Sequence, residues 1–326
     1  MPESQSLGAF DGKYVLVTGA GGFIGKHLVA ALASAGAYVT GFGRSNDVTD
    51  QGNIRWCTGD FSDPMSLARA CEGQDIVYHL LNSSTPASST QNPVGDINSN
   101  LIPSIQLLEA AVGAGVKSFI FFSSGGTVYG QSSDIIKSER CQTDPQSAYG
   151  ISKLSIEKYC RLICHSNNVD YKVLRLSNPY GPGQSPFRKQ GIVAVALHAA
   201  LSGQKFDLWG DGEVIRDFIF IDDVVRAAMQ VVFAVTEYQL FNVGTGVGRS
   251  INSVIRDIAS AAAVDFKLIR HPSRNIDVSS NILDVSRLES IGWSSTVPWN
   301  IGLERTKDWI EKEYGSAKLS YFKNSV

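Results

Sequence analysis

The glycine-rich stretch TGAGGFIG at residues 18–25 constrains the fold of this chain more than any other segment. It follows the apolar run 14–17 and opens a helix-length apolar pattern, and a strand, a glycine turn and a helix in that order form a dinucleotide phosphate site. Gly19 lets the chain turn sharply out of the strand, Gly22 removes a side chain where a pyrophosphate approaches, and Gly25 lets the helix pack closely on the sheet. The helix's free N–H groups and positive end then face the anion. The spacing is GxxGxxG rather than the commoner GxGxxG, and a purely structural turn is the alternative.

Short runs rich in β-branched and aromatic residues alternate with helix-length patterns through the first half of the chain. The predicted strands are 14–18, 38–42, 54–58, 76–81, 119–123 and 171–176, and the predicted helices are 25–35, 64–71, 98–114 and 148–166. This alternation predicts an α/β fold with a doubly wound parallel sheet covered by helices on both faces. Ligands of such sheets bind beyond the carboxyl ends of the strands, which makes the hydroxyl-rich segment 83–89 a candidate wall of the ligand cleft.

A change in pattern near residue 178 divides the chain. The 326 residues, 43% of them hydrophobic, can bury a large core. Beyond residue 178 the alternation loosens into loops rich in Pro and Gly. We expect a dinucleotide-binding domain over 13–177 and a smaller mixed α/β substrate lobe over 178–316, with room for the last strand and some helices to cross back. Residues 1–12 and 317–326 are expected to be tails.

The composition points to a small-molecule partner. A net charge of −2 from 29 basic and 31 acidic residues gives no electrostatic footprint for nucleic acid or an anionic membrane. No apolar stretch is long enough to span a bilayer, and the first residues do not resemble a signal peptide, so we expect a cytoplasmic protein. The five cysteines are odd in number and widely spread, which argues against a disulfide framework. The five histidines form no ligand motif, so no metal site is expected.

A second cluster carries candidate chemistry. Tyr149 and Lys153 lie one turn apart on a predicted helix, and the segment SSGGTVYG at 123–130 ends a predicted strand. The spacing allows the Lys153 ammonium to approach the Tyr149 phenol and favour the phenolate, although the phenol's ordinary pKa is about 10. Alone, such a pair is more often a Tyr and a Lys at a helix flank. Together with the glycine turn and the serine-rich strand end it indicates proton transfer.

With these motifs in order, the chain resembles the extended short-chain dehydrogenase/reductase family, and within it the nucleotide-sugar epimerases and dehydratases, most of all the UDP-hexose 4-epimerases. The resemblance spans about residues 13–309. It rests on TGAGGFIG, SSGGTVYG, YGISK at 149–153, SNPYGP at 177–182, GDG at 210–212 leading to RDFIFIDDV at 216–224, and RNID at 274–277. It implies a Rossmann domain that holds NAD or NADP and a C-terminal lobe that clamps a nucleoside-diphosphate sugar.

The resemblance also implies a role for each matching residue. Tyr149 would handle the proton of the sugar's 4-hydroxyl, and Lys153 would hold the nicotinamide ribose and tune Tyr149. The other implied cofactor contacts are Gly19, Gly22, Phe23, Ile24 and Gly25 at the phosphates and Asp60 and Phe61 near the adenine. The implied substrate contacts are Asn178, Arg216 and Arg274 at the diphosphate, Asp277 at the nucleoside ribose and Asn281 at the sugar's 2-position. Arg216 has a plainer alternative as an ion-pair partner of Asp217 or Asp222.

The chain departs from the family pattern next to the catalytic pair. Gly125 stands where the family commonly carries a serine or threonine hydroxyl that bonds the sugar's 4-oxygen. Ser124 or Thr127 could replace it, and we favour Ser124 because neighbouring glycines permit a backbone shift; Tyr149 working alone is the alternative. Gly126 and Thr127 replace the Asp-Glu pair of the family's 4,6-dehydratases, which argues against that activity.

The identity of the cofactor and of the reaction stays open at this point. Gly43 replaces the acidic residue that normally binds the adenosine ribose of NAD, and Arg44 beside it could bind the 2′-phosphate of NADP or be an exposed charge. Tightly bound NAD is the first expectation. The leading function is 4-epimerisation of a UDP-hexose or UDP-N-acetylhexosamine through a 4-keto intermediate, since the medium-sized Asn281 leaves both sugars open. The alternative is an NADPH-dependent reductase of a 4-keto nucleotide sugar.

The resemblance further implies a homodimer. The predicted helices 98–114 and 148–166 carry apolar residues on more than one face and would pair with their copies as a four-helix interface. Pro103 inside the first of them should bend it or mark a shifted start.

Overall fold

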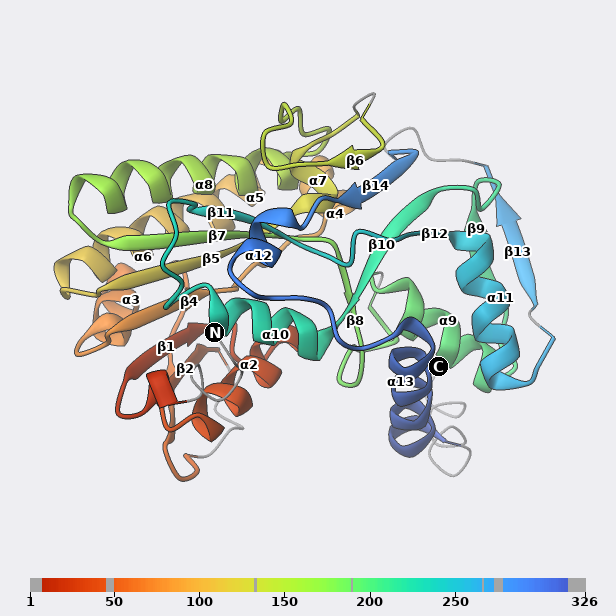
Figure 1. Cartoon of the computed structure of the whole chain (residues 1–326), viewed down its shortest axis with the longest axis horizontal. Coiled ribbons are helices and arrows are strands. Elements are labelled where there is room, and N and C mark those ends of the chain that lie inside the picture. The colour runs from red at the N-terminus through yellow and green to blue at the C-terminus, as the bar shows by residue number, and fades with distance from the viewer. Residues whose placement is uncertain are drawn as a thin grey trace.

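A seven-stranded parallel sheet organises the computed structural model, which describes residues 8–44, 50–131, 134–188, 190–265, 267–272 and 278–315 (Figure 1). The strand order is β11-β7-β5-β4-β1-β2-β3, and every neighbouring pair is parallel. The strands are β1 (Tyr14–Thr18), β2 (Tyr38–Gly43), β3 (Ile54–Thr58), β4 (Ile76–His79), β5 (Ser118–Ser124), β7 (Asp170–Leu176) and β11 (Leu240–Val243). The order reverses between β1 and β4, and ligands of such folds bind at this switch point.

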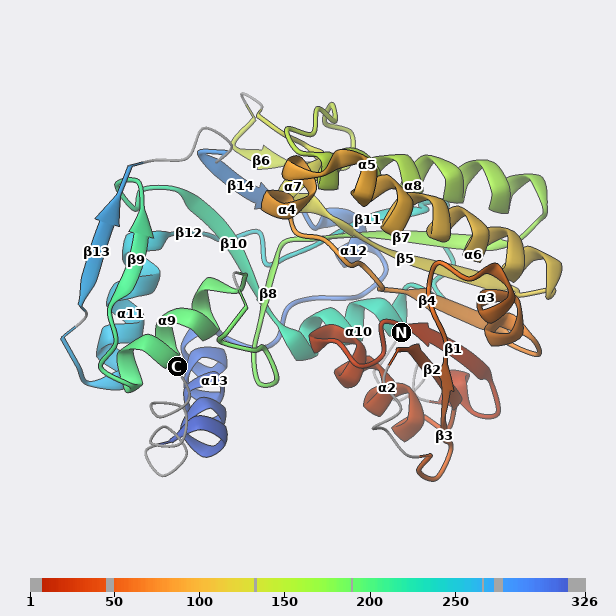
Figure 2. The same cartoon turned by 180° about the vertical axis from the view of Figure 1, so that it is seen from behind.

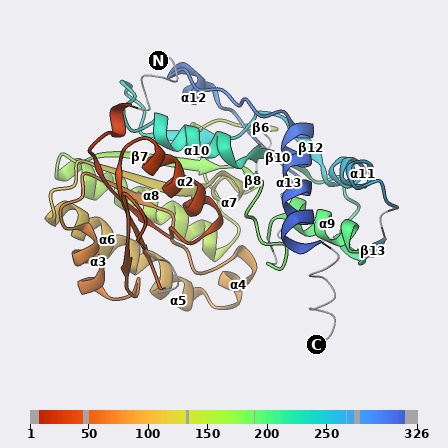
Figure 3. The same ribbon diagram turned by 90° about the horizontal axis from the view of Figure 1, so that it is seen from below.

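Helices cover both faces of this sheet, which confirms the predicted doubly wound fold. Figure 2 and Figure 3 show α2 (Phe23–Ser34) and α10 (Ile221–Gln230) on one face and α3 (Pro64–Cys71), α6 (Ile102–Gly113) and α8 (Ala148–Ser166) on the other. Strand β1 shows why two cores form. Val15 and Val17 belong to the buried cluster that includes α2, whereas Leu16 belongs to the cluster that includes α6, because successive side chains of a strand point to opposite faces.

The predicted helix 98–114 begins differently from its pattern. A short α5 (Pro93–Asp96) runs into a π-helical turn at Ile97–Leu101, and only then does α6 begin at Ile102. Pro103 is the second residue of α6, which directly follows the π-helical turn, and Leu101 and Ile102 before it already have helical backbone angles. The α-helical pattern therefore starts next to Pro103 rather than at residue 98, within a backbone that is helical on both sides of this point.

The second part of the chain builds a smaller lobe around β10. Its sheet has the order β12-β10-β14-β6 with β8 also paired to β10, while β9 and β13 form a separate pair. Its strands are β6 (Ile136–Lys137), β8 (Asn178–Tyr180), β9 (Phe206–Trp209), β10 (Ile215–Phe220), β12 (Gly248–Ser250), β13 (Leu268–His271) and β14 (Ser280–Leu283). Its long helices are α9 (Ile192–Leu201), α11 (Ile251–Ala262) and α13 (Trp299–Tyr314). The remaining short helices are the 3₁₀ turn Gly8–Phe10, α4 (Pro86–Gln91), α7 (Gly125–Val128) and α12 (Ser286–Ser290).

The two parts interpenetrate. Strand β11 lies at one end of the large sheet, and α10 packs on α2, although both follow residue 178 in sequence. Conversely, β6 from the first part pairs with β14 of the smaller lobe. The division of the chain at residue 177 stays a prediction.

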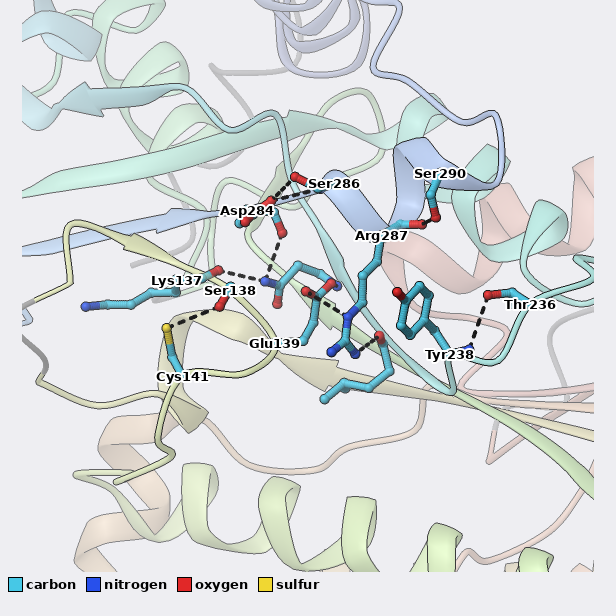
Figure 4. A network of polar contacts seen from close by, with 12 residues as sticks. Lys137, Ser138, Glu139, Cys141, Thr236, Tyr238, Asp284, Ser286, Arg287 and Ser290 are labelled. Carbon is cyan, nitrogen blue, oxygen red and sulfur yellow. Dashed lines mark hydrogen bonds and ion pairs between the residues drawn. The ribbon is translucent and has the colours of Figure 1, made fainter.

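A polar network joins β11 to this shared region, as Figure 4 shows around Glu139 and Arg287. The Glu139 carboxylate accepts a hydrogen bond from the backbone N–H of Asn242 at 2.8 Å and lies 3.5 Å from the Arg287 guanidinium. The Asn242 amide donates to the carbonyl oxygens of Lys137 at 2.7 Å and Asp284 at 3.0 Å. Segments more than 100 residues apart in sequence are thus held together by satisfied buried polar groups.

All five cysteines are free thiols. Within the described ranges, no helix combines the length and apolarity that crossing a membrane requires. The same part of the chain contains no group of three or more His, Cys, Asp or Glu side chains arranged to hold a metal ion.

We predict that Gly25→Ala destabilises the protein. An alanine Cβ at this position would lie 2.2 Å from the Gly19 carbonyl oxygen and 2.8 Å from the Ala20 Cα, and these backbone atoms cannot move aside cheaply. Helix propensity alone would make the change stabilising by about 1 kcal/mol, whereas overpacking should lower the free energy of unfolding by about 3 kcal/mol. Urea unfolding measures the difference. Gly21→Ala is the matched control, because no atom lies within 4 Å of its Cβ position; equal effects of the two changes would contradict the prediction.

Candidate active site

The glycine turn has the geometry that a dinucleotide pyrophosphate requires. Gly19 has φ +73°, a conformation that favours glycine, and Gly22 is the N-cap residue of α2. A Cβ at Gly22 would approach the Gly19 carbonyl oxygen to 3.1 Å, and the space around Gly21 is open. The N–H groups of the first turn of α2, beginning at Phe23, have no partners within the helix and suit an anion. These residues fit the phosphates of NAD or NADP.

The ends of β2 and β3 bring Arg44 and Asp60 near each other at the surface. Both side chains are exposed, and Phe61 is buried next to Asp60. The Asp60 carboxylate accepts hydrogen bonds from the Ser62 backbone N–H at 2.9 Å and hydroxyl at 2.8 Å. These hydrogen bonds lower the pKa of Asp60, and the Arg44 charge contributes in the same direction. The carboxylate therefore offsets part of the Arg44 charge that a 2′-phosphate would need.

A cavity of about 370 Å³ opens between the start of α2 and the carboxyl ends of β5 and β7. Its lining comprises Phe23, Ile24, Ser123, Ser124, Tyr149, Leu176, Ser177, Asn178, Pro179, Tyr180, Gln184, Gln190, Gly191, Ile192, Val193 and Phe218. The predicted cofactor residues Phe23 and Ile24 thus share one cavity with the predicted acid/base Tyr149 and with Asn178. This position lies beyond the carboxyl ends of parallel strands, where ligands of such sheets bind.

Ser124, rather than Lys153, is the group that favours Tyr149 ionisation in this structure. The Ser124 and Tyr149 side chains line the same cavity, and hydrogen bonding to the Ser124 hydroxyl lowers the pKa of the Tyr149 phenol. The Lys153 Nζ lies 5.7 Å from the Tyr149 ring centroid and donates at 2.9 Å to the Phe122 carbonyl oxygen. Burial raises the pKa of Tyr149 to about 12, and the Ser124 hydrogen bond opposes this rise. Burial lowers the pKa of Lys153 to about 8.

The sequence predicts that the Lys153 ammonium directly favours the Tyr149 phenolate, but Lys153 is not among the groups that shift the pKa of Tyr149 in the structure. The i, i+4 spacing does bring the two side chains to the same side of α8, but the ammonium donates its hydrogen bond to the Phe122 backbone carbonyl of β5. Because burial raises the pKa of the Tyr149 phenol, a further positive charge must come near the phenol before it releases its proton at neutral pH.

The missing hydroxyl at Gly125 has a steric explanation. A Cβ there would lie 2.7 Å from Leu283 Cδ1 and 3.2 Å from the Leu176 carbonyl oxygen. The Asn281 amide donates to the Gly125 carbonyl oxygen at 2.9 Å. Strand β14 thus fills the space that a side chain at this position would use.

Of the two substitute hydroxyls, the structure brings Ser124 to Tyr149. Thr127 does not line the cavity, and its Oγ1 is buried without a hydrogen-bond partner among the described residues.

Of the predicted substrate residues, three lie in the described part of the chain. Asn178 lines the cavity and donates at 2.9 Å to the Asp217 carbonyl oxygen. Asn281 lies opposite Arg216 in the register of β10 and β14, and its side chain is 2% exposed. Arg274 and Asp277 lie outside the described residues.

Arg216 donates to the carbonyl oxygens of Ile215 at 2.9 Å and Val278 at 2.7 Å. Its two expected ion-pair partners are engaged elsewhere. The buried Asp217 carboxylate accepts hydrogen bonds from Thr245 at 2.7 and 2.9 Å. Asp222 lies 3.5 Å from Arg305.

Sequence reasoning missed Ser177 as a polar residue of the site. Ser177 follows β7 directly and lines the cavity, and its hydroxyl is buried without a partner in the described part of the chain. Its place just after a strand was the available signal.

The segment 83–89 does not line this cavity; it contacts the start of α8 instead, where the Ser89 hydroxyl accepts a hydrogen bond from the Tyr149 N–H at 2.9 Å.

Comparisons with known proteins agree with this geometry. The model of the NAD dependent epimerase/dehydratase family matches residues 15–244. The chain is 32% identical over 308 residues to a UDP-glucose 4-epimerase of Mycolicibacterium smegmatis, covering 91% of this chain and 98% of that protein. It is 31% identical over 312 residues to a dTDP-4-dehydro-6-deoxyglucose reductase of Escherichia coli, covering 89% of this chain and 95% of the relative.

Solved structures give the same picture. The UDP-glucose 4-epimerase of Thermotoga maritima with UDP-glucose superposes with a TM-score of 0.87 at 32% identity, over 92% of this chain and 99% of that one. The UDP-glucose 4-epimerase of Thermus thermophilus in complex with NAD superposes with a TM-score of 0.86 at 28% identity, over 92% and 99%.

We predict that Ser124→Ala makes Tyr149 harder to ionise. Because the Ser124 hydrogen bond lowers the pKa of Tyr149, its loss raises that pKa and leaves less phenolate at neutral pH. The acid limb of the pH dependence of kcat should move to higher pH, with kcat at pH 7 about tenfold lower. Thr127→Ala tests the other hydroxyl. If Thr127→Ala moves the limb and Ser124→Ala does not, the relay belongs to Thr127.

Proposed function

The chain belongs to the NAD dependent epimerase/dehydratase family, and we propose that it interconverts the 4-epimers of a UDP-hexose or UDP-N-acetylhexosamine through a 4-keto intermediate. The observation that carries this proposal is the cavity in which Tyr149 and Ser124 meet the start of α2. The relatives with UDP-glucose 4-epimerase activity in their names cover nearly the whole chain and support it.

In this proposal Tyr149 takes the proton of the sugar's 4-hydroxyl, and the Ser124 hydroxyl stabilises the phenolate before the transfer. NAD, if bound at the glycine turn, would supply a reversible hydride acceptor for carbon 4, and the net reaction would consume none of it. Tyr149 then returns the proton to the 4-oxygen after the sugar has turned in the cavity. Lys153 would hold the nicotinamide ribose, and the positive charge of an oxidised ring bound there would lower the pKa of Tyr149 from its high value in the free protein.

The nucleotide ends are placed by the remaining residues. The glycine turn would hold the cofactor phosphates, and Asp60 and Phe61 would contact the adenine. Asn178 and Arg216 hold the substrate diphosphate, with Arg274 and Asp277 in the same roles that the resemblance implies. Asn281 would face the sugar's 2-position, as the resemblance implies, and its modest size would admit either a hydroxyl or an N-acetyl group.

A reductase of a 4-keto nucleotide sugar is the second candidate. The 31% identity to a dTDP-4-dehydro-6-deoxyglucose reductase supports it, as do Gly125 and the exposed Arg44, which suits NADPH. NAD is the cofactor we propose, because solved relatives carry it and Asp60 offsets the Arg44 charge. A cytoplasmic location is also a proposal, which the five free thiols support.

We expect purified protein to interconvert UDP-glucose and UDP-galactose, or their N-acetylamino forms, without net change in cofactor absorbance. Tyr149→Phe should lower kcat by roughly 10²- to 10⁴-fold, as the loss of a general acid/base does, and leave NAD affinity within about twofold. Coupled assay of the product sugar and fluorescence titration of NAD measure the two effects. Consumption of NADPH only in the presence of a 4-keto sugar would assign the reductase instead, and an unchanged kcat in the variant would remove Tyr149 from the mechanism.

A homodimer through α6 and α8 is part of the proposal. The two helices pack on each other, and their outer sides expose Ile102 (43%), Ile151 (54%), Tyr159 (37%) and Leu162 (62%). On α8 the spacing of Ile151, Tyr159 and Leu162 puts the three side chains along one helix face, and exposed apolar stripes of this kind are typical of interfaces.

We predict that the double variant Ile151→Asp and Leu162→Asp is monomeric. Two unpaired carboxylates from each protomer, buried in the interface, should cost several kcal/mol of association free energy, and sedimentation equilibrium should report half the wild-type mass. Val235→Asp is the control, since this side chain is 97% exposed and lies outside both helices. A dimer that survives the double change would place the interface elsewhere.

A further inference from the structure

The hydroxyl-rich segment 83–89, which follows β4, forms hydrogen bonds with α8, the helix that carries Tyr149 and Lys153 and that is called the catalytic helix below. The segment does not line the cavity. The Ser83 backbone N–H donates at 2.8 Å to the Asn100 side-chain oxygen. At the other end of the segment, the buried Ser89 hydroxyl accepts a hydrogen bond from the Tyr149 N–H at 2.9 Å. The segment therefore contacts both the π-helical turn and the first turn of α8.

Asp96 is the centre of these contacts. Its side chain is 3% exposed, at the end of α5 and directly before the π-helical turn. One carboxylate oxygen accepts from the Ser152 hydroxyl of α8 at 2.5 Å. The other accepts from the Asn100 amide at 2.9 Å and from the Ser84 hydroxyl. Three elements thus meet at one buried carboxylate.

The donors to Asp96 are neutral, so its charge is not cancelled locally. Within the described residues Asp96 has no ion-pair partner at salt-bridge distance. Burying a carboxylate is costly unless hydrogen bonds or a counter-charge compensate. Ser152 lies between Tyr149 and Lys153 in sequence, which brings the carboxylate to the catalytic pair. In a buried environment such a charge acts on its neighbours over several ångströms.

We propose that Asp96 is a positioning residue of the reaction: through Ser152 it fixes the orientation of the catalytic helix, and its negative charge balances the Lys153 ammonium beside Tyr149. This proposal rests on the proposed roles of Tyr149 and Lys153. The π-helical turn contributes by bringing Asn100 back onto Asp96, and such turns are frequent at functional sites.

The electrostatics agree with this placement. Burial is the main cause that raises the pKa of Tyr149, and the Asp96 charge adds to the rise. Burial lowers the pKa of Lys153, and Asp96 is the first of the charges that oppose it. Three other titratable groups face the cluster. Glu157 and the buried Cys160, both on α8, also support the charged form of Lys153. The buried His79 of β4 has a pKa that is lowered by burial and by the Lys153 charge.

Asp96→Asn tests the charge while keeping the shape. Without the negative charge, the pKa of Tyr149 falls and the pKa of Lys153 falls with it. Both limbs of the pH dependence of kcat should therefore move to lower pH, by about one pH unit. Glu109→Gln is the matched control, since it removes an exposed carboxylate from the neighbouring α6 and should leave both limbs in place. A uniform loss of kcat with unmoved limbs would show a purely structural role and overturn the proposal.

Two further measurements keep the test decisive. Ultraviolet titration of tyrosinate in the NAD-loaded protein, with Tyr149→Phe subtracted, reports the Tyr149 ionisation without any substrate; an unmoved midpoint in Asp96→Asn overturns the proposal even if no epimerisation is found. Ser152→Ala keeps the charge and cuts the link to α8, so kcat should fall about tenfold while KM for the nucleotide sugar stays within about twofold. An unchanged kcat in Ser152→Ala would overturn the positioning role of Asp96. This test holds even if Asp96→Asn does not fold.

Discussion

The close contact between helix α2 and the glycine turn that precedes it underlies this structure. Gly25 approaches the Gly19 carbonyl so closely that a single methyl group would collide with the backbone. This approach fixes where α2 begins, and the start of α2 forms one wall of the cavity in which Tyr149 lies. The phosphate site and the proton-transfer site are therefore set by the same backbone geometry.

The sequence predicts the regular elements well and the polar contacts between them poorly. Strands β1 and β3 and helices α3 and α8 have the predicted bounds, because their apolar periodicity reflects which face is buried. The π-helical turn and the role of Asp96 have no periodic signal: they depend on Ser84, Asn100 and Ser152, which meet only after folding. The spacing of Tyr149 and Lys153 predicts that they lie close together. It does not predict that the Lys153 ammonium donates a hydrogen bond to the Phe122 carbonyl oxygen.

The substitution of glycine for a hydroxyl residue at position 125 also becomes intelligible only in three dimensions. Leu283 and Asn281 of β14 occupy the space and the hydrogen bond at Gly125, although they lie more than 150 residues later in the chain. The smaller lobe therefore shapes the catalytic wall of the larger one. Gly125 departs from the family motif, but the neighbouring Ser124 supplies a hydroxyl and the distant strand β14 fills the space.

The network around Glu139 has a consequence for the protein in a crowded cell. β11 is an outer strand of the large sheet, and outer strands expose N–H and C=O groups on which another chain can add a strand and begin aggregation. Here the Asn242 N–H is occupied by the Glu139 carboxylate, and Arg287 donates at 3.2 Å to the Leu240 carbonyl oxygen. Two charged side chains thus close this edge against further growth of the sheet.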